Sequence, residues 1–307
     1  MSTHDDLMIL VAGSANLDFV VRADHIPAPG ETVLGREFKT FPGGKGANQA
    51  VACARAGGAD TAMLLALGDD AFAAPLEASL KNAGVHLHIH RSSTLPTGTA
   101  FICVSDDAEN AITVAPGANN ALTAQDLPEL SGVSHLVMQL ETPLATVAAY
   151  ARAAKSRGVK VVLNAAPALV LPDELLANLD VLIVNEGELA IVAQHSGDIE
   201  SSLTRLKVPC VVVTLGSQGS LAREQGLVIR QAAFPITPVD TTGAGDTFVG
   251  SFVAALSCGA PLQVALRQAS AASALACLTA GAQSSIPTQT QVQTFLAQVD
   301  ARRPASP

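Results

Sequence analysis

The chain has 307 residues and a formal net charge of −9, and it is 49% hydrophobic but only 3% aromatic. This composition is typical of a globular protein with an extensive core, in one large α/β domain or two smaller ones. Lys and Arg do not cluster along the chain, which excludes the basic footprint of a nucleic-acid-binding protein, so we expect no nucleic-acid partner.

Other features of the chain predict a cytoplasmic protein without a membrane partner. The first residues are acidic where a signal peptide would be basic. The Ala-rich stretch 248–280 is interrupted by Gly259, Pro261 and Arg267, so it does not predict a membrane span. The five cysteines are widely spaced without a CxxC pair, which indicates reduced thiols packed as small hydrophobes.

The first half of the chain contains one predicted core strand, one helix and a group of isolated strands. Residues 8–12 are a short apolar run typical of a central strand, and residues 46–57 predict an Ala-rich helix. Further strand-like segments lie at 19–21, 32–41, 98–104 and 110–114. Because these segments lack the helices of a βαβ pattern, we expect a small antiparallel sheet beside the main domain, able to cover a site.

The second half alternates between Val-rich runs and helical patterns. Short apolar runs at 135–139, 160–164, 181–184 and 208–215 indicate strands buried on both faces of a parallel sheet. Between the first two, Thr142 is the predicted cap of a helix, with Pro143 in its first turn and Gly158 at its end. Repetition of this unit builds a doubly wound, mainly parallel sheet.

A Gly-rich segment, Gly43-Gly44-Lys45-Gly46-Ala47-Asn48, precedes the first predicted helix. Its glycines allow close approach of the backbone to a ligand, and Lys45 and Asn48 would add polar groups for hydroxyls. Gly46 stands where a Walker A loop needs Ser or Thr after the lysine, so the segment is not a P-loop. A plain turn into a helix would have the same pattern.

The segment 240–246, Asp-Thr-Thr-Gly-Ala-Gly-Asp, runs into a second apolar helix. Successive amides at a helix start suit the charge on a transferred phosphoryl group, and Asp246 could take a proton from an attacking hydroxyl. Asp is also a frequent helix cap, and the local pattern alone favours that simpler interpretation.

Polar residues also follow several predicted strands. In doubly wound folds, ligands bind outside the carboxyl ends of the strands, so these residues should converge on one crevice. They are Asn16, Asp18, Glu141, Asn185, Glu186, Glu188, Thr214 and Ser217.

Together these segments resemble the ribokinase (PfkB-type carbohydrate kinase) family over nearly the whole chain. The matching motifs, in the family's order, are GGKGANQA at 43–50, GDD at 68–70, QLETP at 139–143, NEGE at 185–188, TLGSQG at 214–219, VDTTGAGDTF at 239–248 and GAQSSIP at 281–287. GGKGAN and DTTGAGD are the specific ones. The resemblance implies a three-layer α/β/α fold, with a doubly wound, mainly parallel sheet and a small antiparallel β lid.

The resemblance also implies a domain organisation. A single kinase domain would span residues 1–300, with the lid strands inserted within 18–41 and 98–115, followed by a C-terminal tail at 301–307. In the family, lids often pair, which implies a homodimer through the β lid.

The implied reaction is transfer of the γ-phosphoryl group of ATP to the 5-hydroxyl of D-ribose. Asp246 corresponds to the catalytic base, and Gly243, Ala244 and Gly245 correspond to the anion hole. The residues that correspond to ribose contacts are Asn16, Asp18, Gly44, Lys45, Asn48 and Glu141. Those that correspond to the nucleotide side are Asn185, Thr214, Gly216, Ser217 and Gly219.

Two metal ions follow from the same resemblance. Glu188 corresponds to a position near the Mg²⁺ that accompanies ATP. An activating K⁺ site corresponds to Asp240, Thr242, Ala276, Thr279, Gly281 and Ser285. The chain departs from the family at Ser270, where many members carry a His that touches adenine, so the adenine contacts are expected to differ.

Two alternatives stay open on the sequence. The first is a kinase for another small acceptor, namely deoxyribose, a nucleoside or a keto-deoxy sugar acid. The low aromatic content argues against a nucleoside, while Asn16 and Asp18 favour a fully hydroxylated sugar. The second is a non-catalytic sugar sensor, which the intact Asp246 and its neighbouring glycines disfavour.

Overall fold

A nine-stranded sheet runs through the computed structural model, which describes residues 8–302 except residue 108. Its strand order is β13-β12-β11-β10-β9-β8-β1-β4-β5, and all neighbours pair in parallel except at the β12 and β13 edge. The strands are β1 (Met8–Ala12), β4 (Thr61–Gly68), β5 (His86–Ser92), β8 (Val133–Met138), β9 (Lys160–Asn164), β10 (Val181–Asn185), β11 (Cys210–Thr214), β12 (Ser220–Glu224) and β13 (Leu227–Gln231).

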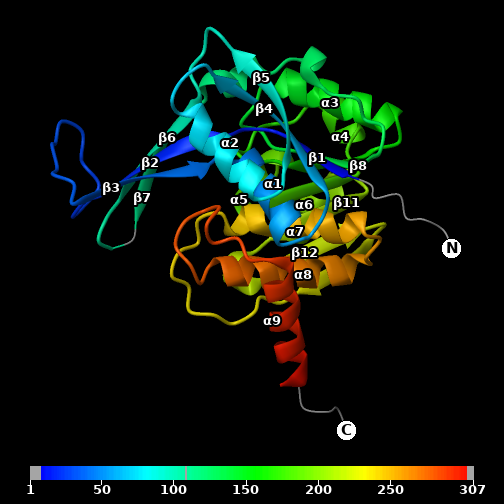
Figure 1. Cartoon of the computed structure of the whole chain (residues 1–307). Helices are drawn as coiled ribbons and strands as arrows, with labels where there is room; N and C mark the ends of the chain where they lie inside the picture. The colour runs from blue at the N-terminus through cyan, green and yellow to red at the C-terminus, as the bar shows by residue number, and fades with distance from the viewer. Residues whose placement is uncertain (1–7, 108, 303–307) are drawn as a thin grey trace.

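Helices cover both faces of this sheet because its strands are apolar on both sides. In β1, Ile9 and Val11 enter one core while Leu10 and Ala12 enter the other. The first core includes side chains of α1 (Lys45–Arg55), α2 (Ala73–Asn82), α7 (Ala244–Ser257), α8 (Leu262–Ala276) and α9 (Gln289–Ala301). The second includes side chains of α3 (Leu144–Ser156), α4 (Asp173–Ala177), α5 (Glu186–Val192) and α6 (Ile199–Arg205). The predicted three-layer α/β/α fold is confirmed (Figure 1).

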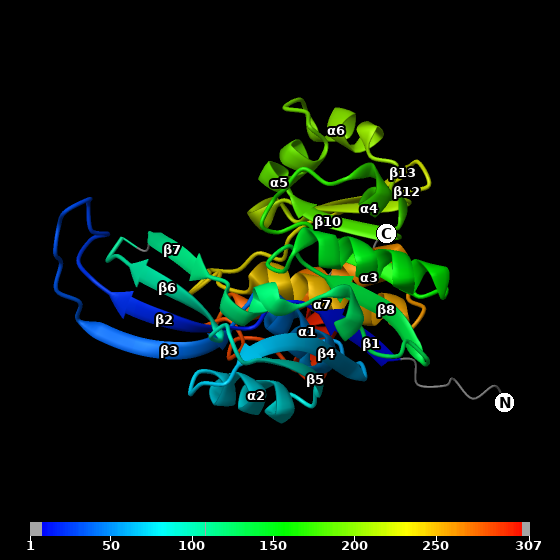
Figure 2. The ribbon, with the colours of Figure 1, turned by 90° about the horizontal axis from the view of Figure 1, so that it is seen from above.

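A four-stranded sheet projects from the main body as the predicted lid (Figure 2). Its order is β3-β2-β6-β7, formed by β2 (Asn16–Arg22), β3 (Glu37–Gly43), β6 (Gly98–Val104) and β7 (Asn110–Ala115). The outer pairs are antiparallel as predicted, whereas the central pair β2 and β6 is parallel. The hairpins β2–β3 and β6–β7 are far apart in the chain and meet through their first strands, β2 and β6.

Most predicted boundaries agree with the structure, and two local predictions are wrong. Thr142 does not cap α3, because Pro143 is the N-cap and no side chain completes the cap. Residues 32–36 are not part of a strand, since β3 begins only at Glu37. Of the predicted tail 301–307, Ala301 ends α9, and residues 303–307 lie outside the described residues.

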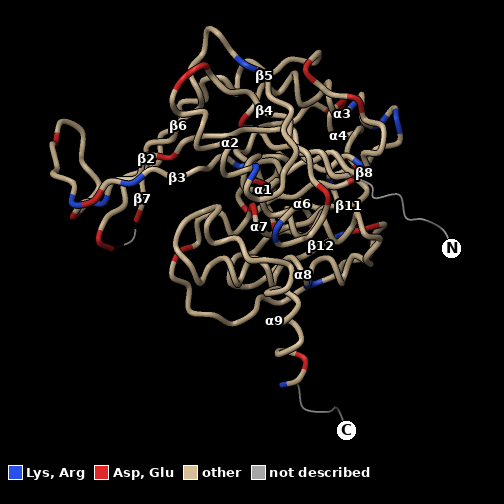
Figure 3. Tube along the Cα trace, in the orientation of Figure 1, with Lys and Arg blue, Asp and Glu red and all other residues tan. Residues whose placement is uncertain are grey.

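Lys, Arg, Asp and Glu residues are interspersed along the described chain (Figure 3). On the lid, Arg22 approaches Glu37 and Arg36 approaches Asp24, so basic residues there have acidic neighbours. No helix within residues 8–302, residue 108 aside, is long and apolar enough to cross a membrane.

The close packing of α1 against α7 aligns the two helix starts that carry the sequence motifs. Gly250 faces α1 so closely that a Cβ atom there would lie 2.6 Å from the Gln49 carbonyl oxygen and 2.7 Å from the Cys53 amide nitrogen. A side chain at residue 250 would therefore push the helices apart. Gly250 lies one turn after Asp246, so this contact brings Asp246 toward the start of α1.

We expect Gly250→Ala to destabilise the protein by about 1–3 kcal/mol, because overpacking between α1 and α7 outweighs the better helix propensity of Ala. Urea denaturation measures the change in the free energy of unfolding. Gly187→Ala is the matched control, since Gly187 is an exposed helical glycine with only the Asn185 side chain nearby. A Gly250→Ala variant as stable as Gly187→Ala would contradict the packing argument.

Candidate active site

Polar side chains converge where the parallel strands end. Ser14 and Asn16 follow β1, Glu141 follows β8, and Asn164 is the last residue of β9. Ser14 Oγ donates to Glu141 Oε2 at 2.5 Å, and the Lys45 amide donates to the same oxygen at 3.1 Å. The segment after β8 is thus joined to the start of α1, and polar side chains from separate strand ends meet at this edge.

Asp246 lies in the first turn of α7 and does not cap the helix. The N-cap is Gly243, with φ +73°, and no side chain completes the cap. Asp246 is 9% exposed, and its two carboxylate oxygens accept hydrogen bonds from Asn48 Nδ2 and Gln49 Nε2, both at 2.9 Å. The structure therefore decides against the simple capping interpretation.

The start of α7 is accessible to a ligand beside Asp246. A Cβ atom on Gly245 would meet no atom within 4 Å outside its own helix. The Ala244 amide already donates to the Thr241 carbonyl at 3.2 Å. The open space at Gly245 allows a negatively charged group to approach the positive end of the α7 helix dipole.

The predicted sugar residues gather around the Gly-rich turn before α1. Gly44 has φ +90°, and a side chain there would come within 2.7 Å of the Asn16 amide nitrogen. Gly43 leaves room for the Asp18 carboxylate in the same way. The amide of Asn119, which is buried, donates to Asn16 Oδ1 at 2.7 Å. The structure therefore brings Asn16, Asp18, Lys45, Asn48 and Glu141 together around Gly44.

Two carboxylates of the site, Asp18 and Glu188, bind protons more tightly than they would in water, mainly because they are buried. Burial raises the pKa of Asp18 to about 7, and the charges of Glu141 and Asp246 add to the effect. Burial also raises the pKa of Glu188. Burial disfavours the charged form of Lys45, but attraction to Asp246, Glu141 and Glu188 outweighs it and raises the Lys45 pKa. Lys45 therefore stays cationic among acidic groups.

A buried network of amides, missed by the sequence analysis, holds Asp246 in place. Gln49 Nε2 donates to Asp246 and also to Asn164 Oδ1 at 3.0 Å. Gln139 Nε2 donates to Gln49 Oε1 at 2.6 Å, and Asn164 Nδ2 donates to the Ile183 carbonyl at 3.2 Å. The sequence signal for these residues was their place in the chain. Gln49 adjoins Asn48, and Gln139 and Asn164 lie at strand ends.

Ser14 and Asn119 were also missed, although both lie close to predicted site residues in the chain or the fold. Ser14 precedes Asn16 by two residues. Asn119 belongs to a short 3₁₀ helix after β7, and its Oδ1 accepts from the Ala15 amide at 3.0 Å. No periodicity marks a residue whose partner lies more than 100 positions away.

The predicted nucleotide residues lie at the ends of β10 and β11. Asn185 pairs with Thr214 in the sheet, and Asn185 and Glu188 form a reciprocal capping box at the start of α5. Gly216 and Gly219 both have positive φ, at +54° and +100°. Ser217 is exposed in the turn between them. Ser270 is buried on α8, and its relation to adenine stays a prediction.

The predicted potassium residues are partly joined by direct hydrogen bonds. Asp240 Oδ1 accepts from the Thr242 amide at 2.9 Å and hydroxyl at 2.7 Å, and Asp240 Oδ2 accepts from the Gly281 amide at 2.8 Å. Burial opposes ionisation of Asp240, but these bonds outweigh it and lower its pKa.

The remaining members of this set lie at the end of α8 and in the loop after it. The Ala276 carbonyl accepts from the Thr279 amide at 3.3 Å, and the Cys277 carbonyl accepts from the Asp240 amide at 3.3 Å. Ser285 Oγ donates to the Ala282 carbonyl at 2.8 Å. The end of α8 thus adjoins Asp240.

We expect Asp18→Asn to stabilise the ligand-free protein at pH 8, with a Tm increase of about 2 °C or more. The folded protein holds a proton on Asp18 up to about pH 7, whereas the ordinary pKa is 3.8, so the contribution of Asp18 to stability falls as pH rises between these values. Thermal denaturation at pH 5 and pH 8 measures the effect.

The Tm difference should shrink at pH 5, where Asp18 of the wild type is mostly protonated. Glu129→Gln, which removes an exposed carboxylate elsewhere, serves as the control. An equal Tm change for Asp18→Asn at both pH values would refute the raised pKa.

The comparisons with known proteins agree with this geometry. The chain is 39% identical over 300 residues to a ribokinase of Haemophilus influenzae, covering 94% of this chain and 98% of that protein. It is 32% identical over 301 residues to a deoxyribokinase of Salmonella typhi, covering 94% and 98%. A structure of Arabidopsis thaliana ribokinase complexed with ribose and ATP matches with a TM-score of 0.86 and 33% identity, covering 94% and 98%.

A protein-family match spans almost the whole chain. The pfkB family of carbohydrate kinases matches residues 6–289, which include the Gly-rich turn before α1, the strand ends and the start of α7. On this match and on relatives above 30% identity, the chain belongs to the pfkB carbohydrate kinase family.

Proposed function

We propose that the chain transfers the γ-phosphoryl group of ATP to the 5-hydroxyl of D-ribose, with Asp246 as the general base. The observation that carries the proposal is the position of the Asp246 carboxylate. It is buried, bonded to two amides of α1, and lies beside an open helix start that can receive a phosphoryl group. Relatives named for ribose support the choice of acceptor.

Asn48 connects the proposed sugar site to the proposed base. Its Nδ2 donates to Asp246, while its buried Oδ1 has no hydrogen-bond partner in the described chain. A sugar hydroxyl can satisfy that oxygen and so be held next to Asp246. Asn16, Asp18, Lys45 and Glu141 would contact the other sugar hydroxyls, and Gly44 leaves space for the sugar.

In the proposed reaction, Asp246 takes the proton of the ribose 5-hydroxyl while the oxygen of that hydroxyl bonds to the γ-phosphorus of ATP. The bond from that phosphorus to the bridging oxygen of ADP breaks, so ribose 5-phosphate and ADP leave. Gly243, Ala244 and Gly245 would receive the charge that spreads over the phosphoryl oxygens. The ATP would lie along Asn185, Thr214, Gly216, Ser217 and Gly219.

Two cations complete the proposal. Mg²⁺ would accompany ATP near Glu188, a carboxylate that suits a hard divalent ion. The predicted potassium residues offer a carboxylate, hydroxyls and backbone carbonyls, all of which are oxygen ligands that K⁺ could use. These residues are Asp240, Thr242, Ala276, Thr279, Gly281 and Ser285. An ion held by these residues would supply fixed positive charge near Asp240, which precedes α7 in the chain. Because ATP is available there, we place the protein in the cytoplasm.

Deoxyribose is the second candidate acceptor, because one relative is a deoxyribokinase at 32% identity. The two sugars differ by one hydroxyl. A site that hydrogen-bonds this hydroxyl through buried polar groups would strongly disfavour the sugar that lacks it. The sensor alternative has no comparable support, since the proposed base and anion-binding turn are both in place.

We expect Asp246→Asn to lower kcat by about 100- to 10,000-fold with ribose while leaving ribose binding within a few-fold of the wild type. An ADP-release assay measures turnover, and calorimetry measures binding of ribose. The same assay is run with ribose, deoxyribose, fructose and adenosine, in K⁺ and then in Na⁺.

Wild-type turnover should be highest with ribose and faster in K⁺ than in Na⁺. The control variant is Glu129→Gln, which should match the wild type. Near-normal turnover of Asp246→Asn would eliminate Asp246 as the base, and turnover only with another acceptor would overturn the ribose assignment alone.

Exposed aromatic residues on the lid support a proposed homodimer. Three aromatic rings gather on one face of the lid sheet, where the centroid of Phe19 lies 5.4 Å from that of Phe101 and 6.1 Å from that of Phe38. Phe38 is 63% exposed and Phe101 is 54% exposed. Exposed aromatic clusters of this kind are typical of association surfaces, and a second lid is the partner we propose.

Phe38→Asp should convert a dimer into a monomer by placing a charge in the proposed apolar interface. Analytical ultracentrifugation at several protein concentrations gives the molecular mass, which is 31.2 kDa for one chain. Leu227→Asp is the matched control, because Leu227 is 72% exposed on β13, outside the lid. A wild type that sediments as a monomer, or a Phe38→Asp variant that stays dimeric, would rule out this interface.

A further inference from the structure

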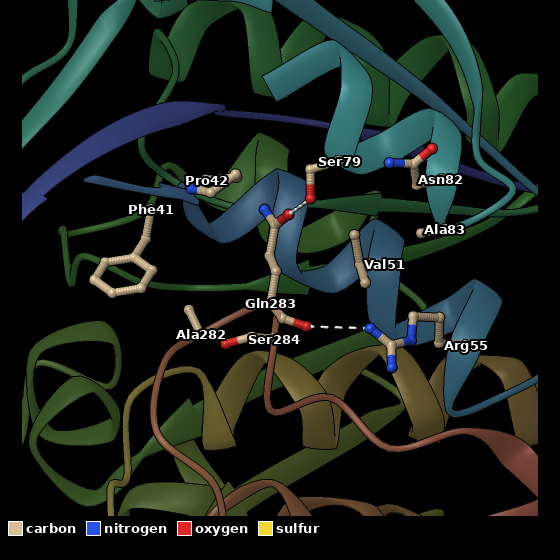
Figure 4. A pocket seen from close by; sticks show the side chains of 10 residues that line it. All are labelled: Phe41, Pro42, Val51, Arg55, Ser79, Asn82, Ala83, Ala282, Gln283 and Ser284. Atoms are coloured by element: carbon tan, nitrogen blue, oxygen red, sulfur yellow. Dashed lines mark hydrogen bonds between the residues drawn. The ribbon is translucent and has the colours of Figure 1, made fainter. Parts of the chain in front are cut away.

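A cavity of about 320 Å³ lies between α1, α2, the end of β3 and the loop that follows α8 (Figure 4). Phe41 and Pro42 form part of its wall, and Val51 and Arg55 line it from α1. None of its lining residues belongs to the proposed sugar, nucleotide or potassium sets. Its volume is at the lower end of the range for small-molecule sites.

The Gln283 side chain lines this cavity with an unsatisfied donor. Gln283 is 6% exposed, and its side chain extends toward α2, where Oε1 accepts a hydrogen bond from Ser79 Oγ at 2.6 Å (Figure 4). Its Nε2 is buried and has no hydrogen-bond partner within the described residues. A buried amide donor without a partner is costly, so a ligand that accepts from Nε2 would be favoured.

Arg55 places a positive charge at the same cavity. Its guanidinium donates to the Gln283 carbonyl at 3.5 Å, which is a long bond, and no described carboxylate lies within 4.0 Å of it. No Asp or Glu lines the cavity. The guanidinium therefore has donors left for an anionic ligand, in a fork that matches a carboxylate.

We propose that this cavity binds a small organic carboxylate. The carboxylate would accept hydrogen bonds from Arg55 and from Gln283 Nε2, while its apolar part would lie against Val51, Pro42 and Ala83. A single cation balances one negative charge, and the apolar part of the lining suits a short hydrocarbon body, beside the polar side chains of Ser79, Asn82 and Ser284. Both features favour a monocarboxylate over a doubly charged phosphate.

The occupant would contact elements that also build the proposed active site. Val51 and Arg55 belong to α1, whose first turns carry Lys45 and Asn48. Ala282, next to Gln283, packs against Gly243, since a Cβ on Gly243 would lie 3.1 Å from Ala282 Cα. Binding here should therefore change the sugar affinity, and sugar should change the carboxylate affinity by the same factor. This coupling rests on the proposed function, whereas carboxylate binding itself does not.

The test titrates the full-length protein with butyrate and benzoate by calorimetry or by ligand-observed NMR. Benzyl alcohol is the neutral counterpart of benzoate. We expect saturable binding of at least one acid, and at least tenfold weaker binding of the alcohol. Increasing ribose and ADP should shift the apparent carboxylate affinity to a limiting value, whereas competition for one shared site would lower that affinity without limit.

Arg55→Met and Gln283→Leu should each weaken carboxylate binding about tenfold or more. Arg205→Met, at an exposed arginine on α6, is the matched control. Asp246→Asn should bind the acid as the wild type does, even if the proposed reaction is wrong. Circular dichroism of each variant verifies folding.

Absence of saturable binding by both acids would overturn the proposal. Wild-type affinity in Arg55→Met and Gln283→Leu, or competition of ribose and ADP with the acid that reaches no limiting value, would overturn it as well.

Discussion

The contact between the Asp246 carboxylate and the amides of α1 is the interaction on which the rest of the site depends. Asn48 and Gln49 each donate to one carboxylate oxygen at 2.9 Å. These bonds require the first turns of two helices almost 200 residues apart in sequence to lie side by side. Gly250 makes this possible, because any larger residue would separate α1 from α7. The placement of the proposed base is thus a consequence of helix packing.

The same contact concentrates negative charge in a partly buried crevice. Burial raises the pKa of Asp18 and of Glu188, and the neighbouring carboxylates raise the pKa of Lys45 despite its burial. Burial is the main cause of the raised pKa of Asp18, and the neighbouring charges of Glu141 and Asp246 add to it. Polar hydroxyls of a sugar can share these charges through hydrogen bonds, which gives the crevice a physical preference for a polyhydroxylated acceptor.

The two proposed binding regions are mechanically connected through α1 and the loop after α8. The start of α1 contacts the crevice, while Val51 and Arg55, farther along the helix, line the second cavity. The loop in turn contacts Asp240 through Gly281 and the start of α7 through Ala282. A ligand in the cavity could therefore affect both α1 and α7, the two helices that define the position of Asp246.

The sequence by itself determined the fold class, the strands at 98–104 and 160–164, and the polar residues at strand ends, because hydrophobic periodicity and family motifs are local signals. Only the tertiary structure decided that Asp246 accepts bonds from α1 instead of capping α7, and that β2 and β6 pair in parallel. It also revealed Gln49, Asn119 and Gln139, whose partners are remote in the chain. The physical reason is that a hydrogen bond between distant segments leaves no period in the sequence, so only packing shows which polar residues meet.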